Sequence, residues 1–368
     1  MASNVVRIFE RSKADNMIGI LNSYGIESRR VSVLEEQNFD IYDIKLERGT
    51  RVSKLDRILI DIGMELGSYV TPTGMPVVRD GVYRLYIQNK DIPSEDFSPI
   101  SSLIKEGSFH DMIAPISLGI DMHNDLFVVD LCKIPNLLIG GVPGSGKSMV
   151  LHSIILSLLA GGNVDLYLSD PKNVEFSLYE DLGDVKTISY SIEDTRATID
   201  DLISIMNNRF VELRKNKVRS FDELNSIKNK VIMKPIVLII DEWADLYFRD
   251  KKIQNTMCIL AQKGRAAGIS VIIATQRPSA QVVSGLIKAS FSGRMCLKTS
   301  SAIDSRIVID HGCADGIEDV GVGYYKDQNH LEPKVFRSFY IESINDEIDR
   351  LSIRRPSFIS KVSRGVWG

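Results

Sequence analysis

Residues 136–148 read NLLIGGVPGSGKS, and this stretch decides the fold of the chain. The apolar residues 137–139 predict a buried strand, the glycine-rich residues 141–146 predict a tight turn, and residues 149–159 predict an apolar helix. A strand, a turn of the form G-x-x-x-x-G-K-S and a helix, in this order, form the context that a phosphate-binding P-loop requires. The alternative, a chance glycine turn, is disfavoured by this context.

Each part of this motif has a predicted chemical role. Glycines allow backbone N–H groups to curl around phosphate oxygens, and the helix N-terminus adds the positive end of its dipole. Lys147 is predicted to reach the β- and γ-phosphates, and the Ser148 hydroxyl to hold Mg²⁺. ATP and Mg²⁺ are therefore the expected cofactors. The predicted nucleotide-binding residues are Gly141, Val142, Pro143, Gly144, Ser145, Gly146, Lys147, Ser148 and Met149.

The composition narrows the class of protein. A chain of 368 residues with 44% hydrophobic residues is long enough for two domains with a sizeable core. The net charge of -3 points to neither nucleic acid nor membrane, so a polyanion would need a local basic surface. No apolar run approaches the ~20 residues of a membrane span, and the N-terminus lacks the pattern of a signal peptide. The four cysteines lack zinc or disulfide spacing, so a cytoplasmic protein without an integral membrane segment is expected.

Two domains are expected. Residues 1–112 mix short strand and helix patterns and predict a small α+β domain, with a strand at 5–9 and a helix at 14–24. Its expected function is packing or oligomerisation. Residues 113–368 form the second domain, which ends in a short basic tail. Runs 116–120 and 126–131 predict a hairpin that leads into the P-loop strand.

A second strand predicts the catalytic carboxylates. Residues 236–240 are uniformly apolar and are followed by Asp241 and Glu242, as expected for a central parallel strand whose carboxyl end faces the P-loop. This is the pattern of a Walker B strand. Asp241 is predicted to hold Mg²⁺, and Glu242 to orient and deprotonate the attacking water. The alternative is an acidic N-cap after an ordinary strand.

The stretch 260–301 adds further candidates. It predicts a helix that ends at Arg265, a strand at 269–274 and a polar end at Thr275 and Gln276. Gln276 is predicted to sense the γ-phosphate. Arg277-Pro278 then forces the chain into a loop, because proline fixes its own φ and restricts the residue before it.

Several of these runs together resemble the motor domain of the FtsK/SpoIIIE DNA translocases. They are LLIGGVPGSGKS, the DPK of 170–172 with Glu175-Phe176, VLIIDEWADL at 237–246, and GRAAGISVIIATQRPS with the GLIKASF and DSRIVID that follow. The similarity runs in order from about residue 116 to 340. More weakly, LERGTRVSKLDRILIDIG resembles the small domain that precedes this motor.

The resemblance implies a RecA-like α/β fold with a parallel-dominated central sheet. It implies a homo-oligomeric ring, expected to be a hexamer, around double-stranded DNA, with ATP at the subunit interfaces. Arg265 matches the arginine finger that each subunit presents to the ATP of its neighbour. The alternative role for Arg265 is a cation that caps its helix. Arg306 is the reserve candidate for the arginine finger. Arg277 and Lys288 match residues that touch the DNA backbone, and Ser301 is the third candidate DNA contact. Next to it, Ala302 departs from the lysine usual in the family.

Three functions remain open from the sequence. The leading hypothesis is an ATP-hydrolysing translocase on double-stranded DNA that serves DNA transfer, packaging or segregation. The chain shows neither the membrane segment nor the winged-helix domain of larger members, so a reduced, soluble member of phage or mobile-element type is expected, with any recruiting protein unidentified. The second hypothesis is a coupling or secretion ATPase that moves a protein substrate. The third is a binder that holds ATP without hydrolysing it.

Overall fold

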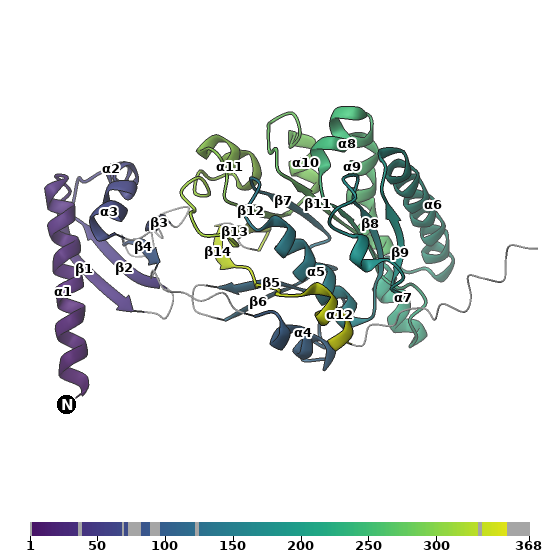
Figure 1. Cartoon of the computed structure of the whole chain (residues 1–368), viewed down its shortest axis with the longest axis horizontal. Coiled ribbons are helices and arrows are strands. Elements are labelled where there is room, and N and C mark those ends of the chain that lie inside the picture. The colour runs from purple at the N-terminus through teal and green to yellow at the C-terminus, as the bar shows by residue number, and fades with distance from the viewer. Residues whose placement is uncertain are drawn as a thin grey trace, which may run out of the picture.

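The computed structural model describes residues 2–35, 39–67, 70–72, 82–88, 96–121, 125–329 and 333–351. Within these ranges the chain forms two sheets, one of four strands and one of ten. Figure 1 shows the small sheet with its helices at one side and the large sheet with its helices at the other. The predicted basic tail after residue 351 lies outside the described residues.

The small sheet is antiparallel throughout, in the order β1-β2-β4-β3. Its apolar face is covered by helices, and Met17, Leu21, Ile44 and Leu85 are among the buried residues of this core. Its elements are α1 (Ala2–Ser23), β1 (Ser28–Glu35), β2 (Phe39–Leu46), α2 (Val52–Arg57), α3 (Leu59–Leu66), β3 (Val70–Pro72) and β4 (Tyr83–Gln88). The expected α+β domain is therefore present.

One element of this domain was predicted wrongly. Residues 5–9, expected to form a strand, lie inside the 22-residue helix α1. Their β-branched and aromatic side chains favour strands. However, no proline or glycine interrupts residues 2–18, so the helix extends through them, and context outweighs a weak local propensity.

The large sheet is mixed and largely parallel. Its order is β6-β5-β14-β13-β12-β7-β11-β10-β8-β9, and the six strands from β12 to β9 are mutually parallel. Strands β13, β14, β5 and β6 complete it with antiparallel pairs. The strands are β5 (Pro115–Asp121), β6 (Leu126–Asp130), β7 (Asn136–Gly140), β8 (Asp165–Ser169), β9 (Val185–Ser189), β10 (Ile236–Ile240), β11 (Ile269–Thr275), β12 (Gly293–Leu297), β13 (Val322–Lys326) and β14 (Lys334–Arg337).

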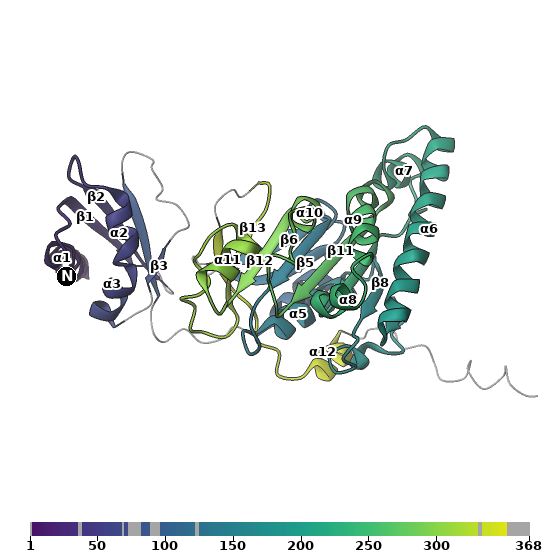
Figure 2. The ribbon, with the colours of Figure 1, turned by 90° about the horizontal axis from the view of Figure 1, so that it is seen from above.

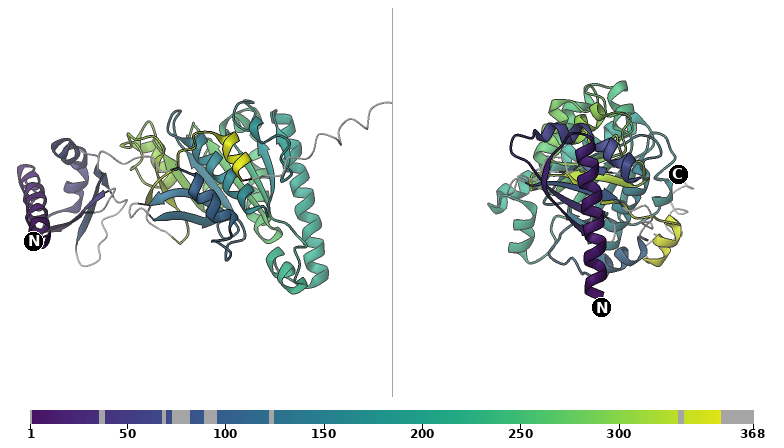
Figure 3. Two further views of the ribbon diagram at one scale, coloured as in Figure 1. Left: turned by 60° about the horizontal axis from the view of Figure 1, so that its bottom comes forward. Right: turned by 90° about the vertical axis from the view of Figure 1, so that its left-hand side faces the viewer.

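Helices cover both faces of this sheet, as uniformly apolar parallel strands require. One face is packed by α4 (Ser98–Lys105), α5 (Lys147–Gly161) and α12 (Ile344–Arg350). The other face is packed by α6 (Ile192–Asn216), α8 (Trp243–Arg249), α9 (Ile253–Gly264), α10 (Gly285–Ser290) and α11 (Ala302–Ile309). Figure 2 shows α6 along the outer edge of the large unit, and Figure 3 (left) shows α7 (Phe221–Lys228) folded back at its end.

The connector between the two sheets contributes to the larger core. Helix α4 packs against α5, and its Ile100 and Ile104 join the buried cluster of the large sheet. These residues lie within 1–112, before the predicted domain boundary, and no helix was predicted for them. The boundary between residues 112 and 113 stays a prediction.

Asn136 ties the P-loop strand to two helices on one face of the sheet. Its buried side-chain amide donates to the carbonyl oxygens of Ala261 (2.7 Å) and Ser290 (3.0 Å), and its Oδ1 accepts from the Val271 N–H (3.3 Å). These bonds join β7 to β11, α9 and α10. Buried backbone groups of this kind need a partner, because an unsatisfied one carries the full cost of desolvation.

We expect Asn136→Ala to lower the free energy of unfolding by about 3 kcal/mol, because the buried carbonyls of Ala261 and Ser290 lose their side-chain donor, whereas the Val271 N–H keeps its bond to the Pro135 carbonyl. Urea denaturation followed by tryptophan fluorescence measures this loss. The matched control is Asn255→Ala, at an exposed position of α9, which should change the free energy by less than about 0.5 kcal/mol. Equal losses in the two variants would contradict a special role for Asn136.

Candidate nucleotide site

The P-loop lies between β7 and α5, at the carboxyl end of the parallel strands. Gly144 and Gly146 adopt φ values of +79° and +96°, which side chains rarely tolerate. A Cβ on Gly146 would also lie 2.8 Å from the backbone nitrogen of Gly321. The turn is therefore restricted to glycine at position 146 by both backbone angle and space.

Within the described part of the chain, this turn contains polar groups that lack hydrogen-bond partners and are placed to bind an anion. The first four N–H groups of a helix lack intrahelical acceptors, and α5 begins directly at Lys147. In addition, the buried Ser145 hydroxyl has no hydrogen-bond partner among the described residues. An orphaned buried hydroxyl beside a helix N-terminus suits a phosphate group, so the residues fit the nucleotide that the sequence predicts.

Lys147 and Asp241 form a buried ion pair in this site. The Lys147 Nζ donates to the Asp241 carboxylate and, at 3.0 Å, to the Asp241 carbonyl oxygen. The two residues expose only 4% and 2% of their surface. Charges buried this far need a partner, and each of these residues supplies the other's. Asp241 follows β10, so the structure brings the P-loop lysine and the first predicted carboxylate together.

Glu242 lies beside them and is held from several sides. Its carboxylate accepts from the Thr275 hydroxyl at 2.7 Å and from the Gln276 N–H at 3.1 and 3.2 Å. It also accepts from Ala244 N at 3.4 Å and lies 3.5 Å from the Lys172 Nζ. Glu242 is therefore the N-cap of α8, the alternative considered from sequence, and it also faces the predicted γ-phosphate sensor Gln276.

Gln276 is placed next to the P-loop by the sheet register. Thr275 pairs with Gly140 across β11 and β7, and the Gly141 N–H donates to the Thr275 carbonyl at 3.2 Å. The residue after Thr275 therefore emerges beside the residues that follow Gly140. The structure brings Lys147, Ser148, Asp241, Glu242 and Gln276 to one edge of the sheet.

The segment after β8 adds residues to this site that the sequence did not assign. Asp170 is fully buried, and its Oδ2 accepts from the N–H groups of Val174, Glu175 and Phe176 at 2.8–2.9 Å. This folds the segment back over the site and places Lys172 near Glu242. The DPK and Glu175-Phe176 runs were quoted for the resemblance without a role for any of their residues. The available signal was the position of Asp170 and Lys172 directly after a predicted parallel strand, at the ligand edge of the sheet.

Glu175 contacts the predicted Mg²⁺ ligand directly. The Ser148 hydroxyl donates to Glu175 Oε1 at 2.7 Å, and His152 Nε2 lies 3.4 Å from Glu175 Oε2. The His152 hydrogen bond, the Ser148 hydroxyl and the charge of Lys147 lower the pKa of Glu175 to about 2, against an opposing effect of burial. Glu175 is therefore ionised at neutral pH.

The oxygen groups at this end of the site fit Mg²⁺. Magnesium prefers carboxylate, hydroxyl and phosphate oxygens and keeps several waters. The Ser148 hydroxyl and the Asp241 carboxylate are such groups, and both lie next to Lys147. These two residues would hold the metal ion.

Arg265 lies away from this constellation. It follows α9 and precedes β11, so it sits at the amino end of the parallel strands, whereas the P-loop follows the carboxyl end of β7. It is exposed and lines a hollow of about 490 Å³ together with Lys133 and Lys263. The structure therefore keeps Arg265 apart from the nucleotide site of its own chain.

The candidate DNA contacts come from three different segments. Arg277 is exposed directly after β11, and Ser301 is the N-cap of α11, where it accepts from Asp304 N at 3.2 Å. Lys288 pairs with Asp310, which also pairs with Arg294 and lies 3.6 Å from Lys326. Although burial raises it, Lys288 and Arg294 hold the pKa of Asp310 below its ordinary value. The reserve finger Arg306 is exposed on α11.

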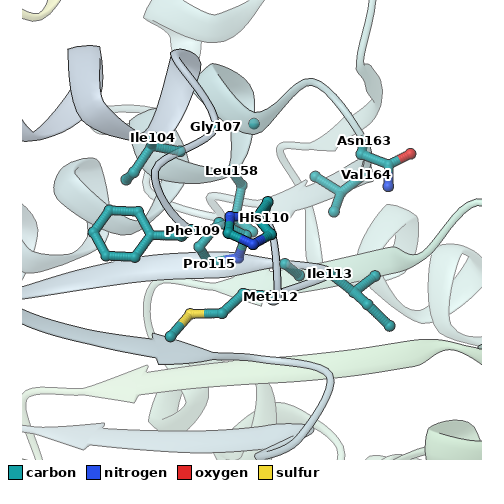
Figure 4. Close-up of a pocket in the computed structure, with 12 residues that line it drawn as sticks. Ile104, Gly107, Phe109, His110, Met112, Ile113, Pro115, Leu158, Asn163 and Val164 are labelled. Carbon is teal, nitrogen blue, oxygen red and sulfur yellow. The ribbon is translucent and has the colours of Figure 1, made fainter.

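A second hollow, of about 170 Å³, lies between α4, α5 and the segment before β5 (Figure 4). Its labelled side chains are mainly apolar, with His110 and Asn163 as the polar exceptions. It contains none of the predicted site residues.

Among the described residues, no helix is both long and apolar enough to cross a bilayer.

Together, the fold and this site define a P-loop protein with a largely parallel sheet. Comparison with known proteins identifies the family: residues 100–280 match the FtsK/SpoIIIE family model. The DNA translocase FtsK of Clostridium acetobutylicum is 30% identical over 351 residues, which cover 92% of this chain and 45% of that protein. The DNA translocase FtsK of Borreliella burgdorferi is 31% identical over 80% of this chain and 38% of that protein. The chain belongs to the FtsK/SpoIIIE family of ATPases and spans less than half the length of these relatives.

Solved structures show the same fold. The conjugation coupling protein TcpA of pCW3, in a monomer form with ATPγS, superposes with a TM-score of 0.64 at 20% identity. The match covers 92% of this chain and 99% of that one. The cytoplasmic domain of the Thermomonospora curvata type VII secretion ATPase EccC matches 66% of this chain and 32% of that one, with a TM-score of 0.59 at 21% identity. The predicted α/β fold with a small preceding domain is thereby confirmed.

We expect Lys147→Ala to weaken ATP binding by about 2–5 kcal/mol, because a buried cation that contacts an anion is removed. It should also destabilise the chain by about 3–5 kcal/mol, since Asp241 is left buried without its partner. The double variant Lys147→Ala/Asp241→Asn should recover stability but not binding. Isothermal titration and thermal unfolding measure the two effects. Tight ATP binding by Lys147→Ala would exclude this P-loop as the nucleotide site.

Proposed function

We propose that this chain hydrolyses ATP with Mg²⁺ as part of a hexameric ring and uses the reaction to move along double-stranded DNA. The observation that carries the proposal is the meeting of Lys147, Asp241 and Glu242 at the carboxyl ends of β7 and β10. Lys147 binds phosphate, Asp241 holds the metal ion and Glu242 takes up a proton. The names of the relatives, DNA translocases at about 30% identity, support the choice of substrate.

The residues of the site divide the chemistry of hydrolysis among them. When ATP binds, the phosphates compete with Asp241 for the Lys147 ammonium, and Asp241 and Ser148 turn to the metal ion. Asp241 and Ser148 would hold Mg²⁺, whose charge would offset the negative charge that develops on the phosphate oxygens. Glu242 receives a proton from the water as the water oxygen bonds to the γ-phosphorus. The bond between the γ-phosphorus and the oxygen bridging to the β-phosphate breaks, and ADP leaves with that oxygen and its electron pair. Gln276, whose backbone N–H donates to Glu242, is proposed to sense the γ-phosphate.

A ring accounts for the position of Arg265. A guanidinium at the amino end of the strands is remote from the P-loop of the same chain but open to a neighbour. In a closed ring of identical subunits, a head-to-tail contact brings one such edge against the opposite edge of the next subunit. We therefore propose that Arg265 completes the nucleotide site of the adjacent subunit. We keep the proposed division into domains 1–112 and 113–368. The small domain is proposed to serve packing or oligomerisation.

We expect Arg265→Ala to leave ATP binding within about twofold and to lower hydrolysis by about 10³-fold, the effect typical of an arginine finger. In mixed rings with Glu242→Gln subunits, activity should return wherever a wild-type Arg265 faces an intact Glu242. Lys263→Ala, two residues earlier at an exposed position, is the matched control and should remain active. Normal hydrolysis by Arg265→Ala would show that the residue is only a helix-end cation.

Phosphate contacts are the expected mode of DNA binding, because a translocase must be indifferent to sequence. Arg277→Ala should reduce the slope of log binding constant against log salt by about one unit, the loss of one phosphate contact. Adding Lys288→Ala should remove a second unit if a DNA phosphate takes the place of Asp310. Filter binding with duplex DNA measures the slope, and Lys54→Ala on α2 is the control. An unchanged slope together with ATPase turnover indifferent to duplex DNA would favour the protein-moving alternative.

A further inference from the structure

Glu175 contacts Ser148 at the metal end of the proposed nucleotide site, and the proposed function assigns Glu175 no role. The hydroxyl of Ser148 has one proton and two lone pairs, and it donates that proton to Glu175 Oε1 at 2.7 Å. While this bond persists, the lone pairs of the Ser148 oxygen point away from Glu175. A hydroxyl that binds a metal ion does so through a lone pair, so the bond to Glu175 sets the orientation in which Ser148 meets the ion.

Hydrogen bonds from the backbone of Glu175 and its neighbours hold Glu175 in this position. Asp170 is fully buried directly after β8. One of its carboxylate oxygens accepts hydrogen bonds from the N–H groups of Val174, Glu175 and Phe176. Such a set of three bonds to an anion is strong and directional. It fixes the backbone of Glu175 relative to the sheet rather than leaving it to a free loop.

A second group fixes the carboxylate itself. His152 lies one turn after Ser148 on α5, with its Nε2 3.4 Å from Glu175 Oε2 and its Nδ1 2.8 Å from the Tyr179 hydroxyl. With the tyrosine hydroxyl as donor, the imidazole carries its proton on Nε2 and donates it to Glu175. Both His152 and Tyr179 are buried. The two oxygens of Glu175 are thus engaged separately, one by His152 and one by Ser148.

We propose that Glu175 is a positioning residue for the metal end of the nucleotide site, accepting the Ser148 proton so that a Ser148 lone pair is presented to Mg²⁺. The proposal rests on the proposed nucleotide site and adds to it an acidic residue outside the P-loop and the Walker B strand. It acts as an outer carboxylate behind a metal-binding side chain. Partners of this kind orient the ligand and typically contribute 10–100-fold to metal affinity.

The test compares nucleotide binding with and without the metal ion, using the full chain and a fluorescent ADP analogue as probe. In EDTA, Glu175→Ala should bind the analogue within about twofold of wild type. The gain in affinity on adding Mg²⁺ should fall by about 10-fold or more. Glu175→Gln keeps an acceptor oxygen for Ser148 and should retain part of the gain. Glu180→Gln, an exposed acidic residue in the same segment, is the control and should behave as wild type.

Each outcome separates the alternatives. If Glu175→Ala keeps the full Mg²⁺-dependent gain, Glu175 does not position Ser148 and the inference is wrong. If affinity falls equally in EDTA and in Mg²⁺, Glu175 only shapes the segment, which also overturns it; thermal unfolding checks that the variants remain folded. If wild type itself binds no nucleotide, the proposed function fails rather than this inference alone. Partial rescue by Glu175→Gln with a normal affinity in EDTA supports it.

Discussion

A lysine ammonium and an aspartate carboxylate face each other in a nearly water-free position between β7 and β10, and the rest of the site is arranged around this pair. Lys147 and Asp241 compensate each other's charge, so neither is left buried alone. In the proposed function, the polyphosphate of ATP offers the lysine a competing partner and frees the carboxylate for a cation. One ion pair thereby links stability to ligand binding.

The sheet decides which residues can join this pair. Parallel strands deliver their carboxyl ends to one edge, and the register of β7 against β11 and of β11 against β10 places Gly141, Asp241 and Gln276 side by side. Asp170 at the end of β8 extends the row by one strand. Arg265 lies just before β11, at the opposite end of that strand. The length of β11 therefore separates Arg265 from these residues. The role proposed for Arg265 therefore requires a second subunit.

Local pattern was sufficient for the central strands and insufficient for the contacts between distant segments. The strand 236–240 was predicted with the bounds that the structure shows, because five consecutive apolar residues followed by two acids leave little ambiguity. Residues 5–9 were misread because strand propensity is weak beside an uninterrupted helix. The contact between Ser148 and Glu175 joins residues 27 positions apart, and that between Lys288 and Asp310 joins residues 22 apart. Such contacts depend on tertiary packing that no periodicity reveals.

The most direct measurement of the central claim is a structure of the chain with ATPγS and Mg²⁺. We expect the Lys147 Nζ to move from Asp241 to the β- and γ-phosphates, while Asp241 and Ser148 turn to the metal ion. A nucleotide bound elsewhere, or one bound at the P-loop with Lys147 still paired to Asp241, would contradict it.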